Sequence, residues 1–289
     1  SHLQNIKVFD YWSSYVGLTQ HDRYLIVNPF FHTFGYKAGW LASLMRGATA
    51  YPCPVFDADQ IIRTIAQHKI SMLPGPPTLY QSILASNELG NSDISSLRLG
   101  VTGAASIPVQ LIKDMKEQLG FETVITAYGL TESTGVVTMC SPVDDYETIA
   151  TTSGCAIAGV ELKCVDTDNN KVLAGEPGEI LVKGYNITQG YFNDPKATQE
   201  AIDEDGWVHT GDIGILDDRG YIKITDRSKD MFIVGGFNAY PAEIENILCD
   251  HPAISQAAVI GIADERMGEV AKAFIILKPE QSLSSDSLI

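Results

Sequence analysis

The chain has 289 residues, of which 45% are hydrophobic and 19% charged, and its formal net charge at pH 7 is −16. This composition is typical of a globular protein with an ample core, built as one large domain or two smaller ones. The negative charge argues against a nucleic-acid partner, because no broad basic face is available to neutralise phosphates.

Five cysteines are scattered along the chain, and no two of them form a CxxC pair. This pattern predicts a reducing compartment and no structural zinc site. No apolar run is long enough to span a bilayer, and the first residues lack the basic-then-apolar pattern of a secretory signal. We therefore expect a cytoplasmic protein without a transmembrane segment.

Between residues 24 and 126, short apolar runs alternate with segments of helical periodicity. We predict strands over 24–27, 48–51, 70–73, 97–101 and 123–126, separated by helices over 35–45, 58–68, 77–85 and 107–119. Asp57 is the expected N-cap of the second of these helices. Repeated strand–helix units predict an α/β fold with a parallel sheet flanked by helices. Ligands of such sheets bind beyond the carboxyl ends of the strands.

Past residue 138 the periodicity changes from helical to alternating. Strands are predicted over 160–165, 178–183, 212–216 and 221–225, and together they indicate a small β-barrel-like subdomain. One helix interrupts them, with Asp194 as its N-cap and Pro195 at its first position. Nearer the C-terminus, a strand over 231–234, a helix over 241–249 and strands over 257–262 and 271–277 are expected.

The stretch from residue 206 to residue 245 reads GWVHTGDIGILDDRGYIKITDRSKDMFIVGGFNAYPAEIE. In it, Asp212 ends a strand with a short carboxylate, which suits a sugar diol. Gly220 closes a hairpin turn in which a glycine can take the positive φ that a tight turn requires. The charged run 226–230 lies between two apolar strands, where it suits an exposed hinge better than burial.

These forty residues resemble the ribose-binding and hinge region of the adenylate-forming enzymes, the superfamily of acyl-CoA synthetases, luciferases and peptide-synthetase adenylation domains. The sequence YGLTE at 128–132 resembles the YGxTE motif of the same superfamily. The resemblance covers nearly all of the chain. It implies that ATP or AMP is contacted by Gly103, Ala104, Thr126, Ala127, Tyr128, Gly129, Thr131, Asp212 and Arg227.

Within the YGLTE loop each residue type suits its implied role. Tyr128 offers a flat face for stacking on adenine, and Gly129 permits a sharp turn. Thr131 offers a hydroxyl to the α-phosphate, and Glu132 offers the oxygen ligand that Mg²⁺ prefers. Taken alone, the loop is also compatible with a capped helix start in which Thr131 or Ser133 is the N-cap.

Two further loops follow predicted strands. The segment NPFFHTFG at 28–35 could form a buried aromatic cluster with a satisfied histidine. The resemblance implies instead that His32 and Phe34 wall the carboxylate pocket, together with Gly103. Peptide-synthetase domains place an aspartate near this segment, which here has no carboxylate, so an apolar acid is favoured over an amino acid. The loop 101–106, with Gly103 and Ala104, is equally compatible with a plain strand–helix turn.

The resemblance implies an acid–CoA ligase, with Mg²⁺ as cofactor and with ATP, CoA and a carboxylic acid as small-molecule partners. Thr131, Glu132 and Lys229 are the expected catalytic residues, and Gly235 and Gly236 the expected CoA contacts. The segments FFHTFGYKAG and LPGPPT resemble bacterial acyl-CoA ligases, some of which act on fatty or steroid-derived ring acids. A homodimer is possible. The alternatives are transfer to a carrier protein or a luciferase-like reaction, and a catalytically silent nucleotide-binding fragment.

The resemblance also implies a division of the chain. Residues 1–136 match the α/β part of a large AMP-binding domain, 137–226 its β-rich subdomain, 227–229 the hinge, and 230–289 part of a C-terminal α+β lid domain. Two parts that the superfamily has, a phosphate-binding loop before the His32 segment and a catalytic lysine late in the lid, are not recognisable. We therefore expect an interior portion of a longer enzyme.

Overall fold

The computed structural model describes residues 1–103, 107–227, 232–234, 237–264, 266–279 and 281–283. The chain forms two compact units. The first comprises Ser1–Leu162, Leu181–His209 and Asp217–Lys223, and the second Lys163–Ile180, Thr210–Leu216 and Ile224–Ile289. Among the helices in the described ranges, none has both the length and the apolar character that crossing a bilayer requires.

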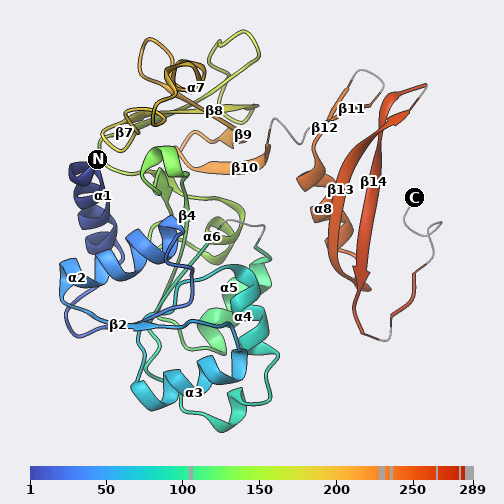
Figure 1. The fold of residues 1–289 in the computed structure, drawn as a ribbon. Coiled ribbons are helices and arrows are strands. Elements are labelled where there is room, and N and C mark those ends of the chain that lie inside the picture. Colours follow the sequence, from blue (N-terminus) through green and yellow to red (C-terminus); the bar gives the residue numbers. More distant parts are fainter. Residues whose placement is uncertain (104–106, 228–231, 235–236, 265, 280, 284–289) are drawn as a thin grey trace. The chain divides into compact units, whose positions relative to one another are not determined.

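A largely parallel sheet organises the first unit (Figure 1). Parallel pairs join β1 (Arg23–Ile26) to β2 (Thr49–Pro52) and β3 (Leu99–Gly103) to β4 (Thr123–Tyr128). The predicted strand at 70–73 is reduced to a bridge at Met72, which pairs with Tyr24 and Leu99. Pro74, two residues further on, has no N–H to donate to a neighbouring strand, although the Gly75 amide still donates to the Val101 carbonyl at 3.0 Å. The short strands β5 (Thr138–Met139) and β6 (Cys155–Ala156) add antiparallel pairs beyond β4.

The helices of the first unit lie around these strands, as predicted for an α/β fold (Figure 1). The predicted helix 58–68 is confirmed as α3, and Asp57 caps it by accepting a hydrogen bond from the Gln60 amide at 2.7 Å. The described helical segments of the first unit are α1 (His2–Tyr15), the π-helix η1 (Phe34–Leu41), α2 (Ala42–Arg46), α3 (Ala58–His68), α4 (Pro77–Leu84), η2 (Leu89–Asn91), α5 (Val109–Glu117), η3 (Thr131–Ser133), α6 (Tyr146–Thr151) and α7 (Pro195–Ala201).

Helix α1 is not predicted by the sequence reasoning, although the sequence carries a signal for it. The Ser1 hydroxyl accepts from the Gln4 amide, and Gln4 bonds back to the terminal amine, which is a capping box. Val8, Phe9 and Trp12 then bury one face of the helix. The spacing of these three residues is helical, and their burial anchors α1 in the core.

The alternating half of the chain forms an open sheet. Its strands follow the order β10-β9-β8-β7, where β7 is Val160–Val165, β8 Pro177–Gly184, β9 Val208–Leu216 and β10 Ile222–Arg227. All four strands are predicted from the sequence. The expected barrel-like arrangement is corrected to a four-stranded sheet, because β7 and β10 lie at its two edges and no closed barrel forms among the described residues.

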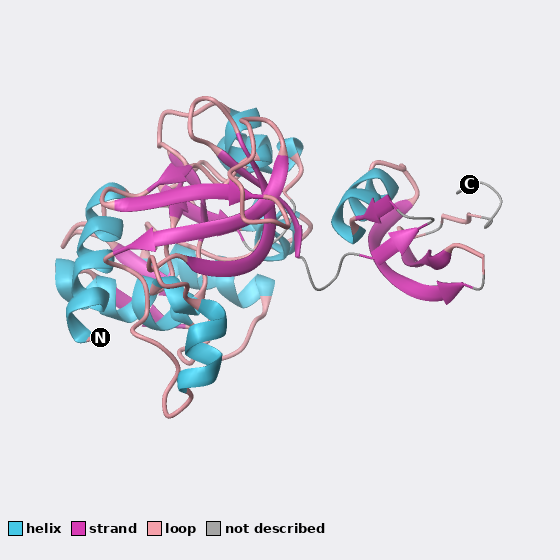
Figure 2. Ribbon diagram, turned by 90° about the horizontal axis from the view of Figure 1, so that it is seen from above, coloured by secondary structure: helices cyan, strands magenta, loops and turns pink. Residues whose placement is uncertain are grey.

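The C-terminal part of the second unit is α+β, as predicted. Its antiparallel sheet has the order β12-β11-β14-β13, formed by β11 (Phe232–Val234), β12 (Phe237–Ala239), β13 (Ile254–Asp264) and β14 (Gly268–Leu277). Helix α8 (Pro241–Cys249) lies against the β13–β14 hairpin (Figure 2). The Glu245 carboxylate accepts from the Val259 amide at 2.8 Å and links helix to hairpin. Strand β12 is not predicted.

A buried ion pair joins the amino ends of the parallel strands. Asp22, whose side chain is 3% exposed, precedes β1 and accepts two hydrogen bonds from the Arg98 guanidinium at 2.8 and 2.5 Å. Arg98 precedes β3, and Ser71, which precedes the Met72 bridge, donates to the same carboxylate at 2.7 Å. Burial raises the pKa of Asp22, but the donors from Arg98, Ser71 and Thr19 outweigh burial and hold the pKa below its ordinary value.

Replacing Asp22 by asparagine is expected to lower the free energy of unfolding at neutral pH by about 2–3 kcal/mol, because hydrogen bonds to a charged group are lost at a buried site. A carboxyl with a depressed folded-state pKa contributes stability above its unfolded value, and this contribution is lost as the pH falls. The difference between wild type and variant should therefore shrink below about pH 4.

Urea unfolding at a series of pH values measures this difference. Asp93→Asn is the matched control, because the Lys69–Asp93 pair is exposed and exposed pairs contribute little. An Asp22→Asn effect that is equal at pH 7 and pH 3 would contradict the assignment.

Candidate active site

The YGLTE loop begins where β4 ends. Gly129 lies so close to Gly135 that a Cβ atom on it would be 2.4 Å from the Gly135 carbonyl oxygen. The loop is closed by a hydrogen bond from the Val137 amide to the Tyr128 carbonyl at 2.8 Å. The predicted helix start is a single 3₁₀ turn, η3, in which the Ser133 hydroxyl accepts from the Leu130 amide. Only glycine fits at position 129, as a sharp turn demands.

Gly103, in the predicted loop 101–106, lies next to the start of the YGLTE loop through the parallel register of β3 and β4. Gly103 is paired with Ala127, and a Cβ on Gly103 would lie 2.8 Å from the Ala127 carbonyl oxygen. Gly103 also has a φ of +154°, which disfavours any other residue. The two predicted nucleotide contacts are therefore neighbours at the carboxyl ends of adjacent strands. Ala104 lies outside the described residues.

Thr126, also predicted at the nucleotide, turns its hydroxyl inward. It lies 2.9 Å from the Ile149 carbonyl, 3.0 Å from the Thr152 carbonyl and 2.9 Å from the Cys140 sulfur. The side chain is buried, and so is Cys140, whose thiol pKa is raised by burial. These contacts hold β4 against α6, and a nucleotide contact of Thr126 stays a prediction.

The segment 28–35 packs against the end of the YGLTE loop. A Cβ on Gly135 would lie 3.4 Å from the Thr33 Cβ. Next to Thr33, His32 is exposed and accepts through Nδ1 from the Phe34 amide at 3.2 Å, while Phe34 is half-buried. The alternative interpretation of a buried aromatic cluster is wrong, because Phe31 is 94% exposed. All three predicted loops are thus adjacent within the first unit.

Lys37, on the π-helix η1, is a residue that the sequence reasoning missed. Its ammonium donates to the Thr134 carbonyl at 3.3 Å, and burial lowers its pKa below the ordinary lysine value. No described carboxylate lies within 4.0 Å of this ammonium. A half-buried cation without an acidic partner therefore contacts the end of the YGLTE loop. The π-helix that carries it is a type of turn that is frequent at functional sites.

A second feature that the sequence reasoning does not find is the segment 184–191, here called the strap. The Thr134 hydroxyl donates to the Asn186 carbonyl at 2.6 Å, and the Asn186 carboxamide donates to the Val136 carbonyl at 2.9 Å. The Thr188 amide donates to the Glu132 carbonyl at 2.6 Å. Since Asn186 is fully buried, the strap fixes the YGLTE loop from one side.

Asp212 and Arg227 belong to the second unit. Asp212 is half-buried in β9, and its amide donates to the Thr210 hydroxyl at 3.1 Å. Arg227 ends β10. Because Tyr128 belongs to the first unit, the convergence of these three residues on one nucleoside stays a prediction. Lys229, Gly235 and Gly236 lie outside the described residues.

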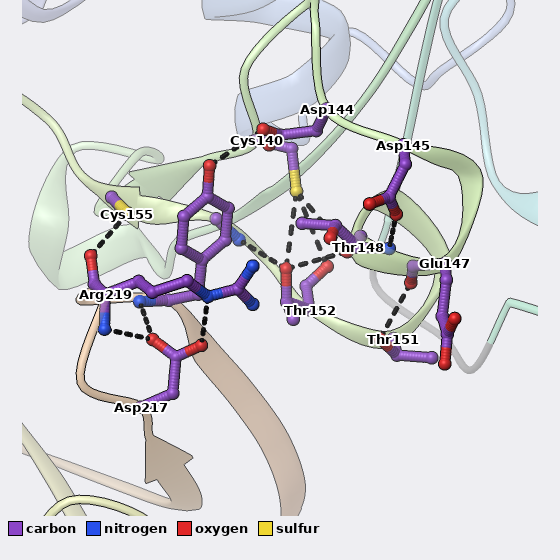
Figure 3. A network of polar contacts seen from close by, with 12 residues as sticks. Cys140, Asp144, Asp145, Glu147, Thr148, Thr151, Thr152, Cys155, Asp217 and Arg219 are labelled. Carbon is purple, nitrogen blue, oxygen red and sulfur yellow. Dashed lines mark hydrogen bonds and ion pairs between the residues drawn. The ribbon is translucent and has the colours of Figure 1, made fainter.

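A polar network holds the turn between β9 and β10 (Figure 3). Asp217 accepts from the Arg219 amide and guanidinium at 2.9 and 2.8 Å, and from the Tyr221 amide at 2.8 Å. The Tyr221 hydroxyl donates to Asp144 at 2.8 Å, and burial together with this bond raises the Tyr221 pKa. Gly220 has a φ of +85°, which confirms the predicted hairpin turn.

Two family profiles match this chain. The profile described as AMP-binding enzyme matches residues 1–192, and that of the AMP-binding enzyme C-terminal domain matches residues 243–289. The chain belongs to the AMP-binding enzyme family. The resemblance drawn from the YGLTE and hinge motifs is therefore confirmed.

Among the relatives of this family member, a 3-[(3aS,4S,7aS)-7a-methyl-1,5-dioxo-octahydro-1H-inden-4-yl]propanoyl:CoA ligase of Rhodococcus jostii (strain RHA1) is 49% identical over 289 residues, 100% of this chain and 54% of that protein. The crystal structure of ATP-bound MatB from Rhodopseudomonas palustris superposes with a TM-score of 0.92 at 29% identity, over 100% of this chain and 56% of that one.

An o-succinylbenzoate–CoA synthetase (MenE) from Bacillus subtilis, in complex with ATP and magnesium ion, gives a TM-score of 0.86 at 31% identity, over 99% of this chain and 57% of that one. This family member thus spans about half the length of the curated relatives it matches.

Replacing Asn186 by alanine is expected to lower the free energy of unfolding by about 1–3 kcal/mol, because the buried Val136 carbonyl loses its partner. Urea unfolding measures the change. Asn87→Ala at an exposed position is the control and should stay within about 0.5 kcal/mol of wild type. Equal effects of the two substitutions would contradict the supporting role of the strap.

Proposed function

We propose that the complete polypeptide containing this chain is an acid–CoA ligase, which converts a carboxylic acid, ATP and CoA to an acyl-CoA, AMP and pyrophosphate. The observation that carries this proposal is the adjacency of the three loops, through the Gly103–Ala127 register and the Thr33–Gly135 approach. Family membership and the ligase relatives support it. Because the chain spans about half of those relatives, the activity belongs to the longer protein.

In the first half-reaction, an oxygen of the substrate carboxylate attacks the α-phosphorus of ATP, and pyrophosphate leaves. Thr131 donates its hydroxyl to an α-phosphoryl oxygen, where negative charge has to be stabilised. Tyr128 stacks on adenine, while Asp212 accepts hydrogen bonds from the ribose hydroxyls with Arg227 beside it. Gly103, Ala104, Thr126, Ala127 and Gly129 complete the proposed nucleotide contacts.

The donor set suits magnesium. Glu132 offers a carboxylate with one oxygen bonded to Tyr191, and no group of three ligand side chains is present among the described residues. Mg²⁺ is commonly held by one or two carboxylates together with substrate phosphates, so Glu132 would hold it with the ATP phosphates. When bound, the ion neutralises phosphate charge.

In the second half-reaction, the CoA thiol attacks the acyl carbonyl of the adenylate, its proton is lost, and AMP leaves. We propose that the lid, residues 230–289, turns about Lys229 between the two steps, as hinge-driven switches do. Gly235 and Gly236 would then lie along the pantetheine arm, where they present no side chain.

For the acid, we propose a ring-containing propanoic acid that carries ketone groups, similar to the one in the name of the Rhodococcus jostii ligase. Two observations support a polar acceptor on the substrate. His32 is exposed beside Phe34 in the segment 28–35, and the Lys37 ammonium retains N–H donors beyond its bond to Thr134. Lys37 is the donor proposed for a ketone oxygen. The scattered free cysteines agree with the cytoplasm as location, and a homodimer stays a prediction.

The function is tested by incubating the complete polypeptide with ATP, Mg²⁺, CoA and a panel of fatty and ring-containing acids, and by measuring pyrophosphate and acyl-CoA separately. Pyrophosphate release without acyl-CoA would leave an adenylating enzyme with another acceptor. Release of neither product would favour a catalytically silent nucleotide-binding protein.

Asp212→Ala is expected to raise KM for ATP about tenfold or more, because charge-assisted hydrogen bonds to the ribose are lost. The matched control is Asp218→Ala, which removes an exposed carboxylate from the nearby β9–β10 turn and should leave KM unchanged. Identical KM values for both variants would rule out the ribose contact.

A further inference from the structure

The carboxylate of Glu132 is bonded to Tyr191, the last residue of the strap. The Tyr191 hydroxyl donates to Glu132 Oε1 at 2.7 Å, and the Thr188 amide donates to the Glu132 carbonyl at 2.6 Å. Both the main chain and the side chain of Glu132 are therefore bonded to one continuous segment. This arrangement restricts the rotamer of Glu132 as well as the position of its backbone.

The phenol is the principal partner of this carboxylate. In the described part of the chain, no lysine or arginine nitrogen lies within 4.0 Å of Glu132, and no hydrogen bond reaches its Oε2. The phenolic O–H is a hydrogen-bond donor and the carboxylate an acceptor, so the Tyr191 hydroxyl takes up one of the two oxygens of Glu132.

The donor is itself held in place. The Tyr191 amide donates to the Thr198 hydroxyl of α7 at 2.9 Å. Gly190, just before it, has a φ of +134°, and a Cβ there would lie 2.6 Å from Thr198 Cγ2. Asp194 caps α7 by accepting from the Ala197 amide at 2.9 Å. The phenol therefore projects from a backbone fixed against a capped helix, although the ring is 42% exposed.

We propose that Tyr191 is a positioning residue for magnesium binding. Its hydroxyl donates to Oε1 of Glu132 and fixes the rotamer of this carboxylate, which leaves Oε2 for the cation that accompanies ATP. This inference rests on the proposed function, in which Glu132 holds Mg²⁺. Partners that orient metal-binding carboxylates commonly contribute 10–100-fold to metal affinity. Because the ring is partly exposed, we expect the lower end of that range.

The test uses the complete polypeptide and two variants that each remove one phenolic oxygen from the strap. Tyr191→Phe removes the donor to Glu132. Tyr185→Phe is the matched control, because the Tyr185 hydroxyl makes no hydrogen bond to Glu132 and its pKa is raised mainly by burial. Water-proton relaxation titrations measure the affinity for the Mn²⁺ complex of α,β-methylene-ATP. Calorimetry in EDTA measures the affinity for the metal-free nucleotide.

Tyr191→Phe should weaken binding of the Mn²⁺ complex about tenfold and leave metal-free binding unchanged, while Tyr185→Phe changes neither. Equal loss in both measurements would indicate general damage to the loop and would overturn the positioning role. Unchanged Mn²⁺ binding in Tyr191→Phe, together with a loss in Glu132→Gln, would overturn the positioning role alone. Unchanged Mn²⁺ binding in both Tyr191→Phe and Glu132→Gln would overturn the metal assignment to Glu132 in the proposed function.

Discussion

The conformation of the YGLTE loop, the proposed nucleotide-binding loop, depends on the hydrogen bonds that the strap makes to it. Main-chain and side-chain hydrogen bonds alternate along this contact, from Thr134 to Asn186, from Asn186 to Val136 and from Thr188 to Glu132. A loop that contains a left-handed residue at Thr134 is costly to hold in one conformation without such support. The strap supplies that support from residues fifty or more positions away in the chain.

A second constraint comes from the parallel register. Parallel strands end at one edge, so residues that are distant in sequence become neighbours there. Gly103 and Ala127 meet because β3 and β4 are in register, and Thr33, the residue before η1, approaches Gly135. The glycines at 103, 129 and 135 let backbones approach where a side chain would collide. An exposed histidine, a half-buried lysine and a glutamate are left around this edge.

Much of the fold follows from local signals. Asp57 and Asp194 are polar caps before helical periods, and both helices begin where these residues indicate. The strand at Met72 is shorter than predicted, and Pro74, just after the predicted segment, has no N–H to donate to a neighbouring strand. The barrel-like expectation fails because local alternation does not state whether a sheet closes. Tyr191 and Lys37 were missed for a different reason. Their importance arises from partners far along the chain, Glu132 and Thr134, and neither periodicity nor a short motif indicates such contacts.

The Asp22–Arg98 pair lies at the amino ends of the strands, opposite to the loops that are proposed to bind the substrates. Under the proposed function, the ion pair that anchors the sheet and the loops that select the acid lie at different ends of the same strands. Substitutions in the loops could then admit a new acid while the sheet retains its anchoring. This separation gives a physical reason why one scaffold can serve ligases of differing specificity.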